Sequence, residues 1–244
     1  MTGPYIDING LNTYYELHGE GEPLLLMHGG FCTVETFQHQ TPEFANHYRV
    51  YLPERRAHGR TPDPGAISYD LMADDTIGFM QALGIENAHL VGFSDGANTA
   101  LIVALKRPDL VKKIVSIGGN FHANGMTPQS LQYFEIAAPD RFLPHLVEAY
   151  KRLSPDGPDH FPAVFEKIIR MWRDEPTITA EELSRITAPT LVLVGDRDMM
   201  TIEHTVELFR SVANGRLCIL PGAHGVPFDR SALVNQVILE FLAG

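Results

Sequence analysis

Short apolar runs bounded by Gly, Pro or Asn alternate along the chain with longer segments in which apolar residues recur every three or four positions. This alternation favours a mainly parallel sheet whose strands are connected by helices. The predicted strands span 5–8, 13–17, 24–28, 48–53, 88–93, 113–117, 190–194 and 217–220. The predicted helices span 34–46, 69–83, 96–106, 202–212 and 232–242. Asn9-Gly10 joins the first two strands, and because both residues tolerate positive φ, we expect a hairpin that opens the sheet in antiparallel fashion.

The segment 122–185 breaks this rhythm. It contains no recognisable strand, and prolines punctuate its short helical patches rich in Phe, Leu and Tyr. A stretch of this length is too long for a structureless loop, so it predicts a helical cap over one end of the sheet. The expected organisation is a core at 1–121 and 186–244 with a cap at 122–185.

Composition disfavours nucleic-acid binding, membrane spanning and metal binding. Of the 244 residues, 44% are hydrophobic and 20% charged, which is typical of a globular protein, and the net charge of −11 disfavours nucleic acid as a partner. No apolar run reaches the ~18 residues of a membrane span, and the first residues lack the pattern of a secretory signal. Two isolated cysteines and no cluster with metal-ligand spacing predict reduced thiols and no metal site. We therefore expect a cytoplasmic protein without a membrane partner.

The pentapeptide at 92–96, Gly-Phe-Ser-Asp-Gly, follows an apolar strand and opens a helix. In this G-x-S-x-G context the serine sits on a sharp strand-to-helix turn, which makes Ser94 a candidate nucleophile for acyl transfer. Asp95 is an alternative nucleophile, but centring the bend on it would place Phe93 and Ala97 where the turn needs minimal side chains. Ser94 fits the pattern better.

An aspartate and a histidine follow Ser94 in the order nucleophile, acid, histidine, each after a predicted strand. With these motifs the sequence resembles the α/β-hydrolase superfamily over essentially its whole length. The resemblance implies a mostly parallel eight-stranded sheet flanked by helices, with the cap inserted after the sixth strand. It also implies that His224 is the general base and that Asp198 orients it, while the neighbouring Asp196 fixes the turn after its strand.

The run 28–31, His-Gly-Gly-Phe, resembles the oxyanion motif of the same superfamily. It implies that backbone N–H groups of Asp95 and of Gly30 or Phe31 stabilise the oxyanion. The stretch 55–61 resembles a loop that supports the active site structurally, so we assign no catalytic role to His58.

Substrate contacts are predicted from position alone. Phe31, Phe121, Trp172 and Met199 adjoin the motifs or lie in the cap, and are candidates for the pocket wall.

Asp95 has two readings: an acidic residue that suits a helix N-terminus, or a carboxylate that attracts a substrate cation. The second reading follows from a resemblance to the biphenyl hydrolase-like branch, which includes valacyclovir-type amino acid ester hydrolases.

The leading hypothesis is a cofactor-free serine hydrolase that cleaves a small to medium carboxylic ester, including amino acid esters and lactones, through an acyl-enzyme. Its partner would be a small-molecule ester. Two alternatives stay open: C–C bond hydrolysis or perhydrolysis on the same triad, and a ligand-binding receptor with negligible turnover.

Overall fold

The structure, a computed structural model, describes residues 3–244; residues 1 and 2, with which the predicted core opens, lie outside the described part. Eight strands form one sheet in the order β1-β2-β4-β3-β5-β6-β7-β8. Their bounds are β1 (Tyr5–Ile8), β2 (Leu11–His18), β3 (Glu22–Met27), β4 (Tyr48–Pro53), β5 (Ala88–Phe93), β6 (Val111–Ile117), β7 (Thr190–Arg197) and β8 (Gly215–Ala223). Strand β2 pairs antiparallel with β1 and β4, and the other pairs are parallel. The predicted α/β-hydrolase fold, with its mostly parallel eight-stranded sheet, is confirmed.

The hairpin between β1 and β2 has the expected turn. Asn9 and Gly10 have φ angles of 55° and 78°, and Ile8 pairs with Leu11 across the turn. Left-handed conformation at both central residues matches the right-handed twist of the two strands. The local sequence therefore determines the antiparallel start of the sheet.

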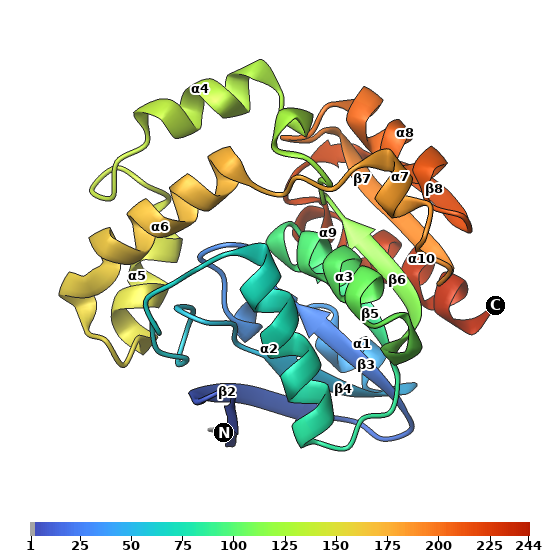
Figure 1. The fold of residues 1–244 in the computed structure, drawn as a ribbon, viewed down its shortest axis with the longest axis horizontal. Coiled ribbons are helices and arrows are strands. Elements are labelled where there is room, and N and C mark those ends of the chain that lie inside the picture. Colours follow the sequence, from blue (N-terminus) through green and yellow to red (C-terminus); the bar gives the residue numbers. More distant parts are fainter. Residues whose placement is uncertain (1–2) are drawn as a thin grey trace.

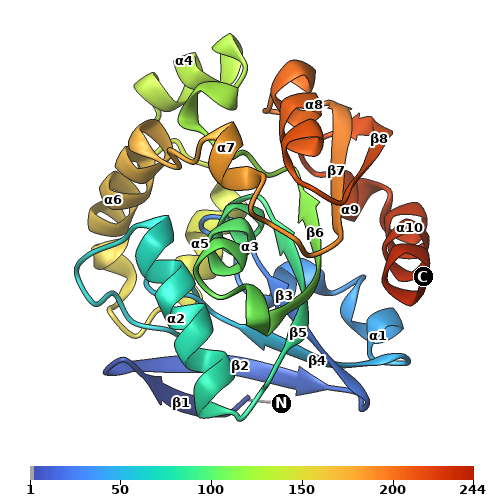
Figure 2. The same cartoon turned by 45° about the vertical axis from the view of Figure 1, so that its right-hand side comes forward.

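Helices cover both faces of the sheet (Figures 1 and 2). Those outside the segment between β6 and β7 are the 3₁₀ turns η1 (Val34–Phe37) and η2 (Pro108–Leu110) and the helices α1 (Thr41–Phe44), α2 (Tyr69–Ala82), α3 (Asp95–Lys106), α8 (Ile202–Ser211), α9 (Val226–Asp229) and α10 (Ser231–Ala243). Alternate side chains of β3 enter different cores. Leu25 and Met27 pack with residues of α2 and α3, whereas Leu24 and Leu26 pack with residues of α1 and α10. Burial on both faces explains why the strands read as continuous apolar runs.

One predicted helix is wrong in extent. Instead of a continuous helix over 34–46, the structure has the two short elements η1 and α1. Pro42 has no N–H to donate to the carbonyl of Gln38, so a regular helix cannot pass through it. Between the two elements the buried Gln40 amide donates to the carbonyl of Pro227 and to Asn235.

The segment between β6 and β7 is helical, with η3 (Ala123–Gly125), α4 (Pro128–Ile136), α5 (Pro144–Leu153), η4 (Pro158–His160), α6 (Phe161–Asp174) and α7 (Ala180–Leu183). Figure 1 shows α4, α5 and α6 gathered on the side of the molecule toward which the arrowhead of β6 points. Their apolar residues form a third core that also includes Phe31, Tyr69 and Met72 from outside the segment. Within residues 3–244, no helix is long and apolar enough to cross a membrane.

The strand order reverses direction at β3, which has β4 on one side and β5 on the other. In open parallel sheets, ligands bind outside the carboxyl ends of the strands at such a switch point. Gly30 follows the end of β3, and Ser94 follows the end of β5. The topology therefore brings the predicted oxyanion motif and the predicted nucleophile to one place.

Candidate active site

Ser94 lies in a strained turn between β5 and α3. Its φ and ψ angles are 52° and −120°, and its N–H donates to the carbonyl of Ile117 on the neighbouring strand at 2.8 Å. A Cβ on Gly96 would lie 1.9 Å from the carbonyl oxygen of Met27, and a Cβ on Gly92 would lie 2.3 Å from the carbonyl carbon of Gly96. The two glycines of the motif are therefore required for the backbone to pass through this bend, and a serine held at positive φ points to a functional constraint.

Asp198 and His224 form a hydrogen-bonded pair. Nδ1 of His224 lies 2.7 Å from Oδ1 of Asp198, whose side chain is fully buried. Burial alone raises the pKa of Asp198, but the interaction with His224 and the backbone N–H groups of Met199 and Met200 hold the pKa below its ordinary value. An ionised carboxylate only accepts, so Nδ1 of His224 carries the proton and Nε2 keeps a free lone pair. This tautomer is the one a general base needs.

The His224 ring packs beside the turn that carries Ser94. Its centroid lies 4.9 Å from that of Phe93, the residue before Ser94. A Cβ on Gly118, at the end of β6, would lie 3.0 Å from His224 Nδ1 and 3.3 Å from Asp198 Oδ2. The three predicted triad residues therefore gather around the carboxyl ends of β5 and β6.

Asp196 has a different role from Asp198. Its Oδ1 accepts a hydrogen bond from the N–H of Gly222 at 2.8 Å, two residues before His224. The sequence suggested that Asp196 fixes a turn after its own strand; in the structure β7 continues to Arg197, and the bond crosses to β8. Asp196 thus supports the backbone leading to His224.

The glycine turn after β3 lies against Ser94. A Cβ on Gly29 would lie 3.3 Å from Cβ of Ser94, and Phe31 has a φ angle of 58°. Asp95 is the first residue of α3, where backbone N–H groups have no partner within the helix. Within residues 3–244, the N–H groups of Phe31 and Asp95 have no protein acceptor. These are two of the predicted oxyanion donors.

Buried polar groups fix the strand end that leads into this turn. The N–H of Arg55 donates to Nε2 of His28 at 3.1 Å, so the His28 proton is on Nδ1, which donates to the carbonyl of Gly29 at 2.8 Å. Burial holds the pKa of His28 well below its usual range. His58 packs nearby, and burial together with Arg55 lowers its pKa to about 3. Both histidines are therefore neutral at neutral pH.

Comparisons with known proteins identify the family of the chain. A model of the alpha/beta hydrolase fold matches residues 22–154, which is more than half of the chain. The chain belongs to the α/β-hydrolase family. The hydrolase is 27% identical over 258 residues to the serine hydrolase BPHL of Homo sapiens, covering 99% of this chain and 87% of the relative.

Two further similarities concern other members of the family. The hydrolase is 27% identical over 258 residues to 2-hydroxymuconate semialdehyde hydrolase of Pseudomonas sp. (strain CF600), covering 96% of this chain and 91% of the relative. The meta-cleavage product hydrolase CumD of Pseudomonas fluorescens IP01 superposes with a TM-score of 0.85 at 24% identity, covering 99% of this chain and 98% of CumD. At this identity the superposition shows the shared fold.

In the hydrolase, the Asp95 carboxylate is buried and accepts hydrogen bonds from two neighbouring side chains. It is 2% exposed, and its Oδ1 accepts hydrogen bonds from Tyr69 Oη at 2.8 Å and from Trp172 Nε1 at 2.9 Å. Burial raises the pKa of Asp95, while the buried Arg55, Trp172 and Tyr69 act in the opposite direction. A substrate cation at Asp95 would compete with these donors.

The other predicted substrate contacts fall into two groups. Phe31 belongs to the third core, against which Trp172 and Met199 also pack. Phe121 lies elsewhere, in the core shared with α2 and α3, where its ring stacks on His204 at 4.1 Å. The structure therefore brings Phe31, Trp172 and Met199 together and places Phe121 apart from them.

Sequence reasoning missed two residues of this site, Tyr69 and Arg55. Arg55 is buried, and its guanidinium donates to the carbonyl of His28 and to Thr99 Oγ1. Tyr69 begins α2 and is 26 positions from the Asp95 that it contacts. The only signal for Arg55 was its place in the loop recognised as scaffold, and no local pattern indicated Tyr69.

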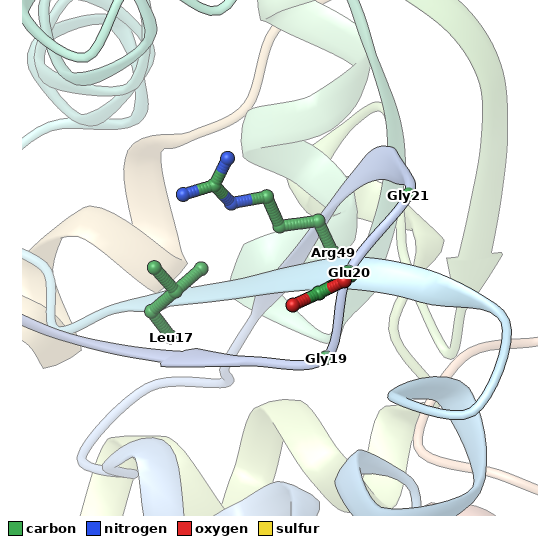
Figure 3. A pocket seen from close by; sticks show the side chains of 5 residues that line it. All are labelled: Leu17, Gly19, Glu20, Gly21 and Arg49. Atoms are coloured by element: carbon green, nitrogen blue, oxygen red, sulfur yellow. The ribbon is translucent and has the colours of Figure 1, made fainter.

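A hollow elsewhere on the molecule does not belong to this site (Figure 3). It is lined by Leu17, Gly19, Glu20, Gly21 and Arg49. These residues lie around the amino ends of β3 and β4, whereas Ser94 follows the carboxyl end of β5, which is parallel to β3. The hollow is therefore at the opposite edge of the sheet.

Proposed function

We propose that this hydrolase cleaves a small to medium carboxylic ester through an acyl-enzyme on Ser94. The observation that carries the proposal is the strained Ser94 turn beside the His224–Asp198 pair. Membership of the α/β-hydrolase family supports hydrolysis as the reaction class.

In the first half-reaction, Ser94 Oγ attacks the ester carbonyl and forms a C–O bond while Nε2 of His224 takes the hydroxyl proton. Asp198 stabilises the resulting imidazolium through the hydrogen bond to Nδ1. The carbonyl oxygen becomes an anion, which the N–H groups of Phe31 or Gly30 and of Asp95 stabilise. When the bond to the leaving oxygen breaks, His224 returns the proton to the alcohol.

In the second half-reaction, water replaces the alcohol. His224 accepts a proton from water as the water oxygen attacks the acyl carbon, and the proton then passes to Ser94 Oγ as its bond to carbon breaks. The products are the carboxylic acid and the free enzyme. In the proposed reaction, the protein groups that act are Ser94, His224, Asp198 and the oxyanion N–H groups, together with water.

Substrate size follows from the surroundings of Phe31. The Phe31 ring is 4% exposed and packs against Phe142 at 4.7 Å and Trp172 at 5.4 Å between centroids. Phe161 and Phe165 lie at 5.8 Å. Aromatic side chains fill the space above the turn at Gly30 and Phe31, which we call the oxyanion turn. We therefore infer that the substrate carries a short acyl group.

A second candidate is C–C bond hydrolysis of a vinylogous diketone. The observation that favours it is the similarity to 2-hydroxymuconate semialdehyde hydrolase over nearly the whole chain. The same three residues would serve both reactions.

A substrate panel tests the proposal and separates the candidates. It contains short and long aryl esters, lactones, α-amino acid esters and a vinylogous diketone, each assayed with the wild-type enzyme and with Ser94→Ala. We expect the highest kcat/KM on short neutral esters and its loss in Ser94→Ala. Preferred turnover of the diketone would support the second candidate, and full ester turnover by folded Ser94→Ala would overturn the mechanism.

A further inference from the structure

The cap and the nucleophile turn meet at the carboxylate of Asp95. This residue directly follows Ser94, and Trp172 of α6 donates its indole N–H to both carboxylate oxygens, at 2.9 and 3.1 Å. Tyr69, at the start of α2, donates its hydroxyl to the same carboxylate at 2.8 Å. One buried side chain thus connects α2, α3 and the cap helix α6.

The position of Trp172 makes this connection relevant to the oxyanion turn. A Cβ on Gly30 would lie 2.5 Å from Cζ2 of Trp172 and 2.6 Å from Oδ2 of Asp95. The indole also meets the ring of Phe31 edge-on, at 5.4 Å and an interplanar angle of 89°. Trp172, which Asp95 holds, therefore covers both Gly30 and Phe31 of the oxyanion turn.

The charge of Asp95 is compensated within the protein. Arg55 is buried beside it, and Thr99 connects the two residues by accepting from the Arg55 guanidinium and donating to the Asp95 carbonyl. The favourable interaction of Asp95 with Arg55 opposes the effect of burial on the Asp95 pKa. Burial still raises the pKa of Asp95, but its carboxylate oxygens already accept from Tyr69 and Trp172, so the protein itself supplies partners that a substrate cation would have to displace.

A second anchor holds α6 at Lys167, in the middle of the helix, and at His160 of the preceding η4. Lys167 and His160 both contact the buried carboxylate of Asp63, at 2.5 and 2.8 Å. This anchor lies in the loop after β4, whereas the Asp95 anchor adjoins Ser94. The two anchors fix α6 over the site. Of the two aspartates, Asp95 belongs to the turn that carries the nucleophile, and Asp63 does not.

We propose that Asp95 is a positioning residue that latches Trp172 of the cap onto the oxyanion turn, and that it is not a ligand for a substrate cation. The proposal rests on the proposed function for its catalytic consequence, and on the geometry of Asp95, Trp172 and Gly30 for the latch itself. With the latch intact, Trp172 and Phe31 border the oxyanion donors. When it is broken, α6 keeps its Asp63 anchor and the bond between the Tyr69 N–H and Glu175 at its C-terminal end, but the wall over Gly30 loosens.

Trp172 is the only tryptophan of the chain, so its fluorescence reports the latch without any assay of activity. The test compares acrylamide quenching of Trp172 and the steady-state kinetics of the wild-type enzyme, Asp95→Asn and Asp109→Asn. Asp95→Asn turns one acceptor into a donor facing the indole N–H and leaves Arg55 without its counter-charge. Asp109→Asn removes a carboxylate exposed at the surface and is the matched control.

We expect quenching of Trp172 to rise in Asp95→Asn only, and kcat to fall about tenfold, the size of one lost hydrogen bond, on neutral and α-amino esters alike. Unchanged quenching would overturn the latch. A selective loss on α-amino esters with unchanged quenching would make Asp95 a cation site. If the enzyme hydrolyses no ester, quenching still decides the latch while the proposed function fails.

A milder pair of variants covers the case in which Asp95→Asn does not fold. Tyr69→Phe removes one donor to Asp95 and keeps the ring, while Tyr133→Phe makes the same change at an exposed position of α4. Circular dichroism verifies that both are folded. Quenching that rises in Tyr69→Phe and not in Tyr133→Phe supports the latch, and equal quenching in the two overturns it.

Discussion

Asp198 and His224 are joined by a hydrogen bond of 2.7 Å between Oδ1 and Nδ1, and the carboxylate is buried while the imidazole stays 20% exposed. The buried partner holds the ring orientation and the tautomer, and the exposed partner remains accessible to substrate. The two residues are 26 positions apart in the chain, and in the proposed mechanism this hydrogen bond makes them act as one unit.

Replacement of the acid tests that unit. Asp198→Asn keeps the shape of the side chain but places an amide beside Nδ1, which favours the wrong tautomer of His224. We expect kcat to fall by about 10⁴, as is usual when the orienting carboxylate of a triad becomes an amide. Asp196→Asn is the matched control, because the oxygen of an asparagine amide can accept the same hydrogen bond from the N–H of Gly222, so this variant should retain most of the activity. Equal losses in the two variants would contradict the assignment of the acid.

Space above the oxyanion turn is the subject of a second prediction. In Gly30→Ala the new methyl group would meet Trp172 at 2.5 Å and the Asp95 carboxylate at 2.6 Å, so the indole must move. Overpacking of this kind costs roughly 1–3 kcal/mol, and we expect a lower free energy of unfolding together with a lower kcat. Urea unfolding and ester kinetics measure both. If the free energy of unfolding and kcat both kept their wild-type values, the close packing of Trp172 and Asp95 against Gly30 would be contradicted.

Phe121 gives a third prediction. It is 5% exposed and stacks on His204 at 4.1 Å, apart from Phe31 and Trp172. Phe121→Leu should therefore destabilise the protein by about 1–2 kcal/mol through lost stacking and packing. The ratios of kcat/KM across the substrate panel should stay unchanged. A shift in substrate preference would instead support the direct substrate contact that its place in the sequence suggested.

The sequence and the structure agree where the information is local. The bend at Ser94 and the hairpin at Asn9-Gly10 depend on glycine and asparagine at fixed offsets, and both could be predicted. The partners of Asp95 could not, since Trp172 is 77 positions away and is brought close only when the cap folds over the core. A carboxylate in a first helical turn has the same local pattern whether it binds a cation or accepts from a tryptophan.

Phe121 and the segment 34–46 depend on different kinds of information. Phe121 is predicted at the pocket wall because it follows a strand end near the active-site motifs; in the structure the loop after β6 directs its ring into the core shared with α2 and α3. The break in the segment 34–46 was signalled locally by Pro42, and the apolar periodicity on both sides of the proline outweighed that signal. Periodicity identifies buried positions better than it identifies where a helix ends.

The buried histidines predict an acid-sensitive fold. The pKa of His58 is lowered to about 3 by burial, while the unfolded chain has a value near 6.5. Between these values the unfolded state binds more protons, so His58 contributes stability that is present above pH 6.5 and is lost as the pH falls toward 3. At pH 5 the loss from this group is about 2 kcal/mol.

The variant His58→Gln isolates this contribution. Urea unfolding of the wild-type protein and of the variant at pH 7.5 and pH 5.0 gives the two changes in stability with pH. We expect the wild-type protein to lose about 2 kcal/mol more than His58→Gln over this interval. Parallel pH dependence of the two proteins would mean that His58 binds a proton as readily in the folded protein as in the unfolded chain.

Covalent labelling of Ser94 tests the central claim most directly. A fluorophosphonate reacts with a serine hydroxyl only when a base activates it, and the adduct is identified by intact mass and peptide mapping. We predict one adduct on the peptide that contains Ser94 in the wild-type enzyme, none in Ser94→Ala, and labelling slower by orders of magnitude in His224→Ala. Labelling of Ser94→Ala at the wild-type rate, or of the wild-type enzyme on another residue, would contradict the assignment of Ser94 as the nucleophile.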